Sequence, residues 1–254
     1  MKVFRPFIFI VVLVLAVSLA CGPTTAPTAA PPPPINTNPT AVPPPIEQPT
    51  EAQPTEEQQQ QQPSSGSAFF TEEFDSDPQW YYEVIQGNEK SDPESVKVEF
   101  DDSLMIFEIP DPQLYAYYIY EGYSYEDVKV SVKFENRGVN SQQVSLVCRV
   151  SDDGWYEFAV GSDGLWELYA VSGGYDRLTN GGSNDINQGK AVNEYSMICE
   201  GNEISLFING EEVKGSPHKD TEYSLREGGV GFSISSLRAV PVEIEVDSFT
   251  ISEP

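Results

Sequence analysis

Apolar and polar residues alternate along most of the chain after residue 66. The clearest runs cover residues 96–100, 128–134, 144–150 and 204–208. Successive side chains of a strand point to opposite faces, so this alternation predicts strands that bury one face. The runs are short and recur at intervals of about 8–12 residues, which is typical of β-sandwiches. No convincing amphipathic helix interrupts them.

Turn signals separate several of these runs. Asn209-Gly210 lies between two strand-like stretches and favours a type I′ hairpin, which needs positive φ at both positions. Asp-Gly pairs at 153–154 and 163–164 predict two more hairpins. We therefore expect residues 67–254 to form one all-β domain, an antiparallel two-sheet sandwich.

The first 20 residues have the pattern of a signal peptide. Lys2 and Arg5 precede an apolar run over residues 7–19, which is too short to cross a membrane comfortably. Ser18-Leu19-Ala20 before Cys21 suits a secretory cleavage site and resembles the lipobox of bacterial lipoproteins, although Ser18 stands where Leu is usual. We expect lipidation of Cys21, which would anchor the chain to the outer face of the cell membrane with its domain extracellular. The alternative is plain secretion with Cys21 as a spare thiol.

Residues 21–66 read as a disordered tether. They hold thirteen of the chain's 21 prolines, together with a run of glutamines, and almost no large apolar residue. Such a segment buries too little apolar surface to offset its conformational entropy. As extended polyproline II it would reach on the order of 100 Å or more.

The charge of the chain restricts its partners. It has 40 acidic and 14 basic residues and a formal net charge of −26. Such a field repels nucleic acid and anionic lipid headgroups, so no nucleic-acid partner is expected. It favours neutral ligands, cationic partners or divalent cations, and it also keeps an exported protein soluble.

Two of the three cysteines are predicted to pair. Cys148 is in phase with the apolar positions of its run, and Cys199 is in phase with Tyr195 and Met197, so both point into the core. In an oxidising compartment we expect a Cys148–Cys199 disulfide, which would stabilise the fold by about 4 kcal/mol. The alternative is two free, packed thiols.

Several segments taken in order carry a family resemblance. "FFTEEFDSD" opens the domain, "VSLVCRVSDDGWYEFAVGSDGLWELYAV" and "NEYSMICEGNEISLFINGEEV" follow, and "EGGVGFSI" and "VEIEVDSFTI" close it. This order resembles the concanavalin A-like lectin/glucanase superfamily, and within it the 3-keto-disaccharide hydrolase-type domains of exported bacterial lipoproteins. The resemblance implies a jelly roll, one sheet of which binds sugars in some relatives.

Three carboxylates alternate in the last segment, Glu243, Glu245 and Asp247. Paired carboxylates are the catalytic groups of many glycosidases. The resemblance instead implies a closing strand that pairs with the first strand, near residues 70–74. Because the apolar phase changes near Asp247, we expect a bulge there and a buried or turn-satisfying role for Asp247.

Other catalytic groups are not evident. The single histidine, His218, lies in a polar loop with no nearby nucleophile, and no multi-histidine metal set or CxxC motif occurs. The sequence therefore supports no assignment as an enzyme.

Calcium is the one cofactor that the pattern suggests. Hard oxygen ligands suit Ca²⁺, and they occur in three loops, at Asp152, Asp153, Asp163, Asn184 and Asp185. The alternative is that hairpin turns select these residues for their backbone preferences.

Aromatic side chains are the candidate ligand-binding residues, since amphipathic rings suit recognition of a glycan or a protein. Trp155 is out of phase with the apolar set of its strand, Tyr169 is out of phase with Trp166, and Tyr175 lies in a Gly-Gly-Tyr loop. Tyr118 and Tyr120 belong to a dense tyrosine segment. The alternative is that these rings pack within the sandwich.

Two hypotheses follow. The first is a non-catalytic module that binds a neutral polysaccharide, and the second is an interaction or structural module for a protein of the cell envelope. A glycoside hydrolase ranks third, because fold analogy alone does not establish a catalytic site.

Overall fold

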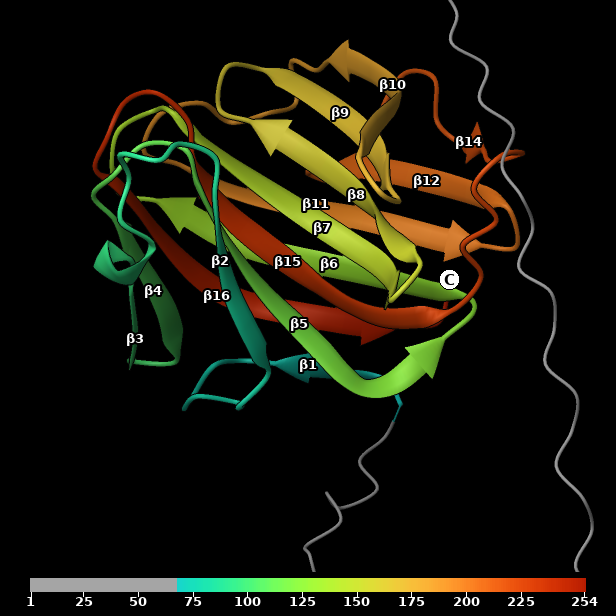
Figure 1. The fold of residues 1–254 in the computed structure, drawn as a ribbon, viewed down its shortest axis with the longest axis horizontal. Helices are drawn as coiled ribbons and strands as arrows, with labels where there is room; N and C mark the ends of the chain where they lie inside the picture. Colours follow the sequence, from blue (N-terminus) through green and yellow to red (C-terminus); the bar gives the residue numbers. More distant parts are fainter. Residues whose placement is uncertain (1–67) are drawn as a thin grey trace, which may run out of the picture. The chain divides into compact units, whose positions relative to one another are not determined.

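The computed structural model describes residues 68–254, and the predicted signal peptide, Cys21 and tether lie outside them. The described residues form sixteen strands and one short 3-10 helix, η1 (Pro93–Ser95), so the all-β prediction is confirmed (Figure 1). None of their helical segments is long and apolar enough to span a membrane.

The strands form two antiparallel sheets. In chain order, the strands of the nine-stranded sheet are β1 (Phe70–Glu72), β3 (Lys97–Asp101), β4 (Leu104–Ile109), β6 (Val128–Asn136), β11 (Val192–Glu200), β12 (Glu203–Ile208), β13 (Glu211–Glu212), β14 (His218–Lys219) and β16 (Val242–Ser252). Its main path runs β13-β12-β11-β6-β16-β4-β3, with β1 paired to β16 and β14 paired to β12.

The seven-stranded sheet carries the site described below. In spatial order its strands are β10 (Tyr175–Gly182), β9 (Leu165–Val171), β8 (Gly154–Gly161), β7 (Gln142–Ser151), β15 (Gly228–Ser236), β5 (Leu114–Tyr125) and β2 (Tyr81–Gln86). Strand β15, late in the chain, lies between β7 and β5, so distant segments meet at the middle of the sheet (Figure 1).

The hydrophobic core fills the space between the sheets. Leu146, Phe158 and Phe232 enter it from the seven-stranded sheet, and Met197 and Val246 from the other, all with no exposed surface. Burying a side chain of this size stabilises the fold by about 1.5–3 kcal/mol. Strand alternation thus decides which residues remain for the outer faces.

The predicted hairpin at Asn209-Gly210 joins β12 to β13. The φ angles there are 51° and 86°, as a type I′ turn requires.

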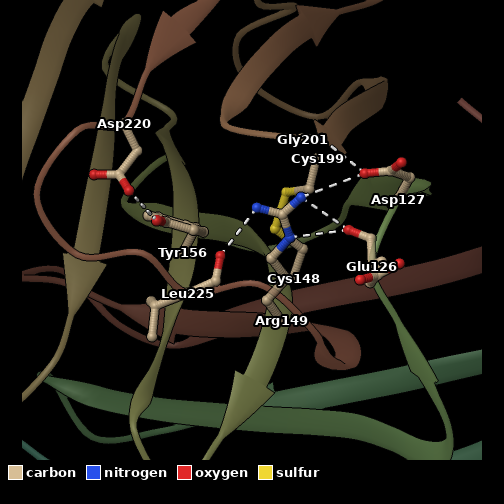
Figure 2. Close-up of a disulfide and its surroundings, with 9 residues drawn as sticks. All are labelled: Glu126, Asp127, Cys148, Arg149, Tyr156, Cys199, Gly201, Asp220 and Leu225. Atoms are coloured by element: carbon tan, nitrogen blue, oxygen red, sulfur yellow. Dashed lines mark hydrogen bonds and ion pairs between the residues drawn. A yellow bond between two sulfur atoms is a disulfide. The ribbon is translucent and has the colours of Figure 1, made fainter.

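The predicted disulfide is confirmed. Cys148 of β7 and Cys199 of β11 are bonded across the core, so the bridge joins the two sheets (Figure 2).

Arg149 departs from the alternation that precedes it. Its φ of 58° coincides with a register shift of β7 against β8, and its side chain is buried directly after the buried Cys148. The guanidinium donates to the carbonyl oxygens of Glu126 and Leu225 at 2.8–3.0 Å (Figure 2). Desolvation by burial lowers the pKa of the Arg149 guanidinium. These bonds tie two loops to the β7 bulge.

The structure of the closing strand, β16, agrees with most of what the sequence predicts. Phe70 of β1 pairs with Ile251 of β16, and the register of β16 shifts between Val246 and Ser248, so the predicted pairing and bulge are confirmed. The predicted buried or turn-satisfying role of Asp247 is wrong. The bulge leaves Asp247 exposed, where it forms a 2.8 Å ion pair with Lys133.

Glu243 and Glu245 of β16 lie on the outer face of the nine-stranded sheet. Glu245 is bonded to Arg137 at 2.8 Å, and Glu243 stands opposite Glu108 of β4. Neither residue lines the hollow on the other sheet that is described next.

Candidate functional site

A hollow of about 450 Å³ opens on the outer face of the seven-stranded sheet. Its aromatic and acidic lining residues are Tyr115, Tyr117, Tyr169, Tyr175, Glu157 and Glu167. They come from β5, β8, β9 and β10, so strands from both sides of the sheet contribute.

Small residues form the middle of this face. In the register of the sheet, Ser233 of β15 and Ser145 of β7 lie between Tyr117 of β5 and Ala159 of β8. Directly opposed residues of an antiparallel sheet share a face, so both serines lie on the outer face with Tyr117. Their small size leaves room above the sheet for large side chains from the flanking strands.

Glu157 is the most buried acidic group of the hollow. Only 4% of its surface is exposed. Its Oε2 accepts hydrogen bonds from the Tyr117 hydroxyl at 2.9 Å and from Trp155 Nε1 at 3.1 Å. Burial raises the pKa of Glu157, whereas the hydrogen bonds from Trp155 and Tyr117 act in the opposite direction.

Glu157 has no basic counter-ion in the described part of the chain. None of the ion pairs within residues 68–254 involves it. Its hydrogen-bond donors are neutral groups, so a negative charge on this carboxyl is incompletely compensated.

Glu167, in contrast, accepts a hydrogen bond on each of its carboxylate oxygens. Its Oε1 accepts from Arg177 at 2.8 Å and its Oε2 from the Tyr169 hydroxyl at 2.5 Å. In the sheet register Glu157 stands opposite Tyr169, and Glu167 stands opposite Ala159, so the two carboxylates are diagonal neighbours. The hollow therefore contains one compensated and one uncompensated carboxyl.

The tyrosine hydroxyls are linked to these carboxyls. Tyr117 and Tyr175 hydroxyls lie 3.0 Å apart. Because Tyr117 donates its own proton to Glu157, the Tyr175 hydroxyl donates to Tyr117. Burial raises the pKa of Tyr117, Tyr169 and Tyr175, so all three keep their protons near neutral pH.

The rings form a continuous aromatic series. The ring centroids of Tyr117 and Trp155 are 6.1 Å apart, those of Trp155 and Tyr175 are 6.4 Å apart, and those of Tyr169 and Tyr175 are 5.9 Å apart, all edge to face. Tyr175 is 53% exposed, so the series is open to solvent at its outer end.

Neighbouring hollows extend the site along the strands. One of about 500 Å³ shares Tyr115 and Leu237 with it, and another of about 300 Å³ shares Gln143 and Glu167. A small one of about 70 Å³ shares Tyr117. Together these adjoining hollows form an elongated depression that is longer than a single six-membered ring.

Three of the five aromatic candidates from the sequence lie together at this site, namely Trp155, Tyr169 and Tyr175. The other two candidates, Tyr118 and Tyr120, do not line the hollow.

Tyr118 and Tyr120 lie on the inner side of β5. Tyr118 is 4% exposed and donates to Asp77 at 2.6 Å, and Tyr120 packs against Phe70 and Trp80. The alternate set, Tyr115 and Tyr117, faces the hollow in their place.

The calcium candidates are distributed over the two ends of β8. Asp152 and Asp153 occupy the turn before β8, and Asp163 occupies the turn after it. Asn184 and Asp185 follow β10, where the Ser183 amide donates to Gly164 at 3.0 Å, next to the Asp163 turn.

Asp163 and Asp185 each accept a hydrogen bond from a neighbouring residue two positions away in the chain. Within residues 68–254, no three His, Cys, Asp or Glu side chains gather closely enough to hold a metal ion. Calcium binding stays a prediction.

The polar residues of the hollow were not identified from the sequence. Glu157, Glu167 and Arg177 lie at outward positions of β8, β9 and β10. One signal was present, because Glu157 is in phase with Trp155, which alternation does place outside.

Comparisons with known proteins show the fold. No protein-family model matches the chain, and no curated protein matches its sequence. The structure is similar to a Bacillus subtilis protein of unknown function with a galectin-like fold, with a TM-score of 0.56, 12% identity and coverage of 74% of this chain and 96% of that chain.

It is also similar to the β-glucanase of Bacillus licheniformis (TM-score 0.53, 11% identity, 74% and 99% of the two chains). A prokaryotic β-1,3-1,4-glucanase (lichenase) derived from a mouse hindgut metagenome is comparable (TM-score 0.54, 12% identity, 73% and 99%). Residues 68–254 thus adopt the concanavalin A-like jelly-roll fold that the sequence resemblance implied.

Proposed function

We propose that this protein binds a polysaccharide, without cleaving it, in the hollow on the outer face of the seven-stranded sheet. The observation that carries the proposal is the grouping of Tyr115, Tyr117, Tyr169 and Tyr175 around two carboxyls in a space of about 450 Å³. Sugar C–H faces pack on aromatic rings, and sugar hydroxyls bond to convergent polar groups. The elongated depression suits a chain of several sugar units.

The similar structures give supporting context. Two of them are glucanases, so their fold is used for recognition of glucan chains in those proteins. At 11–12% identity this similarity does not transfer their activity to the present chain.

The state of Glu167 supports a binding role over hydrolysis. A retaining or inverting glycosidase needs one carboxylate free to attack the sugar or to activate water. Both oxygens of Glu167 are bonded, one to Arg177 and one to Tyr169. Glu157 alone does not supply the required pair.

The proposal includes display outside the cell. Residues 1–20 would direct export, and a lipid on Cys21 would hold the tether (21–66) at the membrane. The Cys148–Cys199 disulfide supports an oxidising compartment, because such bonds are rare in reducing ones.

The test is binding of the protein to a panel of neutral and acidic polysaccharides, by affinity electrophoresis, with calcium and with a chelator. We expect retardation by at least one polysaccharide and a loss of about tenfold or more in affinity for Tyr175→Ala. The matched control is Tyr123→Ala, since Tyr123 is also about half exposed but does not line the hollow. No retardation by any polysaccharide of the panel would reject carbohydrate binding. The alternative hypothesis, binding of a protein partner, would then be tested.

A further inference from the structure

Glu157 is an unusual group for the wall of a site that binds neutral sugars. It is 4% exposed, and the groups that donate to its Oε2 are a phenol and an indole. Buried carboxylates are normally paired with a basic residue or a metal. Arg177 of β10 forms its ion pair with Glu167 and not with Glu157.

A purely structural role does not require this carboxyl. A glutamine would accept the same two hydrogen bonds through its amide oxygen and would carry no charge to desolvate. A charged group whose burial has this desolvation cost is often one that binds a ligand.

The walls of the hollow favour a positive charge. The rings of Tyr115, Tyr117, Tyr169 and Tyr175 line it, and aromatic faces attract cations placed within about 6 Å of the ring centroid. The net charge of −26 acts in the same direction, because it raises the local concentration of cationic ligands.

We propose, on the basis of the carbohydrate binding inferred above, that the ligand is a saccharide containing unsubstituted amino sugars, whose ammonium group is the counter-ion of Glu157. The ammonium group fits between the Glu157 carboxylate and the tyrosine rings, while the remaining sugar units follow the depression past Gln143 and Leu237. Glu167 adds to the negative potential, although its charge is shared with Arg177.

This recognition distinguishes three chemically related ligands. N-acetylation replaces the ammonium group by a neutral amide and removes the ion pair with Glu157. A plain glucose unit has a hydroxyl at the same position and also lacks the charge. A uronic acid brings a second negative charge into an acidic hollow and is repelled.

The experiment is isothermal titration calorimetry of the protein with glucosamine oligomers, N-acetylglucosamine oligomers and glucose oligomers of equal length and linkage, at neutral pH and low salt. We expect the glucosamine oligomer to bind about tenfold or more tightly than the other two. Glu157→Gln removes this preference. Glu121→Gln, which makes the same change in net charge on β5 outside the hollow, retains it.

The outcomes separate this inference from the proposed function. Equal affinities for the three oligomers in the unaltered protein would overturn the amine assignment while carbohydrate binding stands. A preference for the glucosamine oligomer that persists in Glu157→Gln would also overturn it. Binding of none of the three would contradict it, and the polysaccharide panel would then decide separately whether any carbohydrate binds.

Discussion

The Tyr117 hydroxyl donates to Glu157 at 2.9 Å although β15 and β7 lie between the strands that carry the two residues. The contact is diagonal, because Ser233 lies opposite Tyr117, whereas Glu157 lies opposite Val147, two positions along β7 from Ser145. Small residues at the centre of the sheet leave room for side chains from strands that are not adjacent to meet. The hollow is a consequence of that arrangement.

Enlarging Ser233 should disrupt this contact. Ser233→Leu would push the Tyr117 ring away from the sheet and destabilise the fold by about 1–3 kcal/mol, measured by urea unfolding. Ser233→Ala is the control. The Ser233 hydroxyl is buried with no hydrogen-bond partner within residues 68–254, so its removal should cost less than about 0.5 kcal/mol. Equal stability of the two variants would show that Tyr117 does not lie over Ser233.

Glu157 should make the fold less stable at neutral pH. Burial raises its pKa in the folded state, so the folded protein binds this proton more tightly than the unfolded chain does. Stability contributed by the protonated form is lost as pH rises from the ordinary glutamate range through the raised pKa. We expect Glu157→Gln to be more stable than the unaltered protein at pH 7, with the difference shrinking towards pH 4. Unfolding midpoints across this range test it, and a difference independent of pH would contradict it.

The disulfide should be a major source of stability. Its cysteines are 51 residues apart in sequence, and closing a loop of that length stabilises by about 4 kcal/mol on the chain-entropy model. Replacing both Cys148 and Cys199 by Ala should lower the free energy of unfolding by about that amount. The unaltered protein measured in reductant should show the same loss, and an unchanged unfolding curve in both cases would contradict the estimate.

Asp220 should contribute stability that disappears in acid. Burial alone would raise its pKa, but hydrogen bonds from the backbone amides of Glu222, Tyr223 and Ser224 and from the Tyr156 hydroxyl lower it to about 2. Figure 2 shows the bond from Tyr156. A depressed carboxyl pKa stabilises the fold above the unfolded value and loses this effect as pH falls through the folded value.

Asp220→Asn should therefore cost about 2 kcal/mol at pH 7, a deficit that narrows between about pH 4 and pH 2. Asp152→Asn, in an exposed turn, serves as the control and should change stability by less than about 0.5 kcal/mol. A deficit that stays constant down to pH 2 would exclude titration of Asp220 as its cause.

The alternation of apolar and polar residues along each strand predicted which side of the sheet many side chains occupy. It placed Trp155 and Tyr169 outside, and Cys148 and Cys199 inside, because each lies in a strand with one clearly apolar set of positions. The change of phase in the last strand likewise predicted the bulge before Ser248.

The same reasoning fails where both faces of a strand are aromatic. In β5 the alternate sets contain Tyr115 and Tyr117 on one side and Tyr118 and Tyr120 on the other, so alternation does not show which set faces inward. Glu157 was missed for a related reason. The sheet register that brings Tyr117 to it depends on pairing with β15, a strand distant in sequence.

The tryptophan indoles allow the most direct test of binding in the hollow. The chain has three tryptophans, and the Trp155 indole donates to Glu157 at 3.1 Å. Trp80 is half-buried, packs against the core residues Phe74 and Phe249, and serves as the internal reference.

We would record the indole N–H resonances of the ¹⁵N-labelled protein during titration with the polysaccharide panel and the amino-sugar oligomers. A bound saccharide should shift the Trp155 resonance in a saturable manner and leave the Trp80 resonance in place. A saccharide that binds without moving the Trp155 resonance, or a Trp155 resonance unmoved by every saccharide tested, would contradict a carbohydrate site at Glu157.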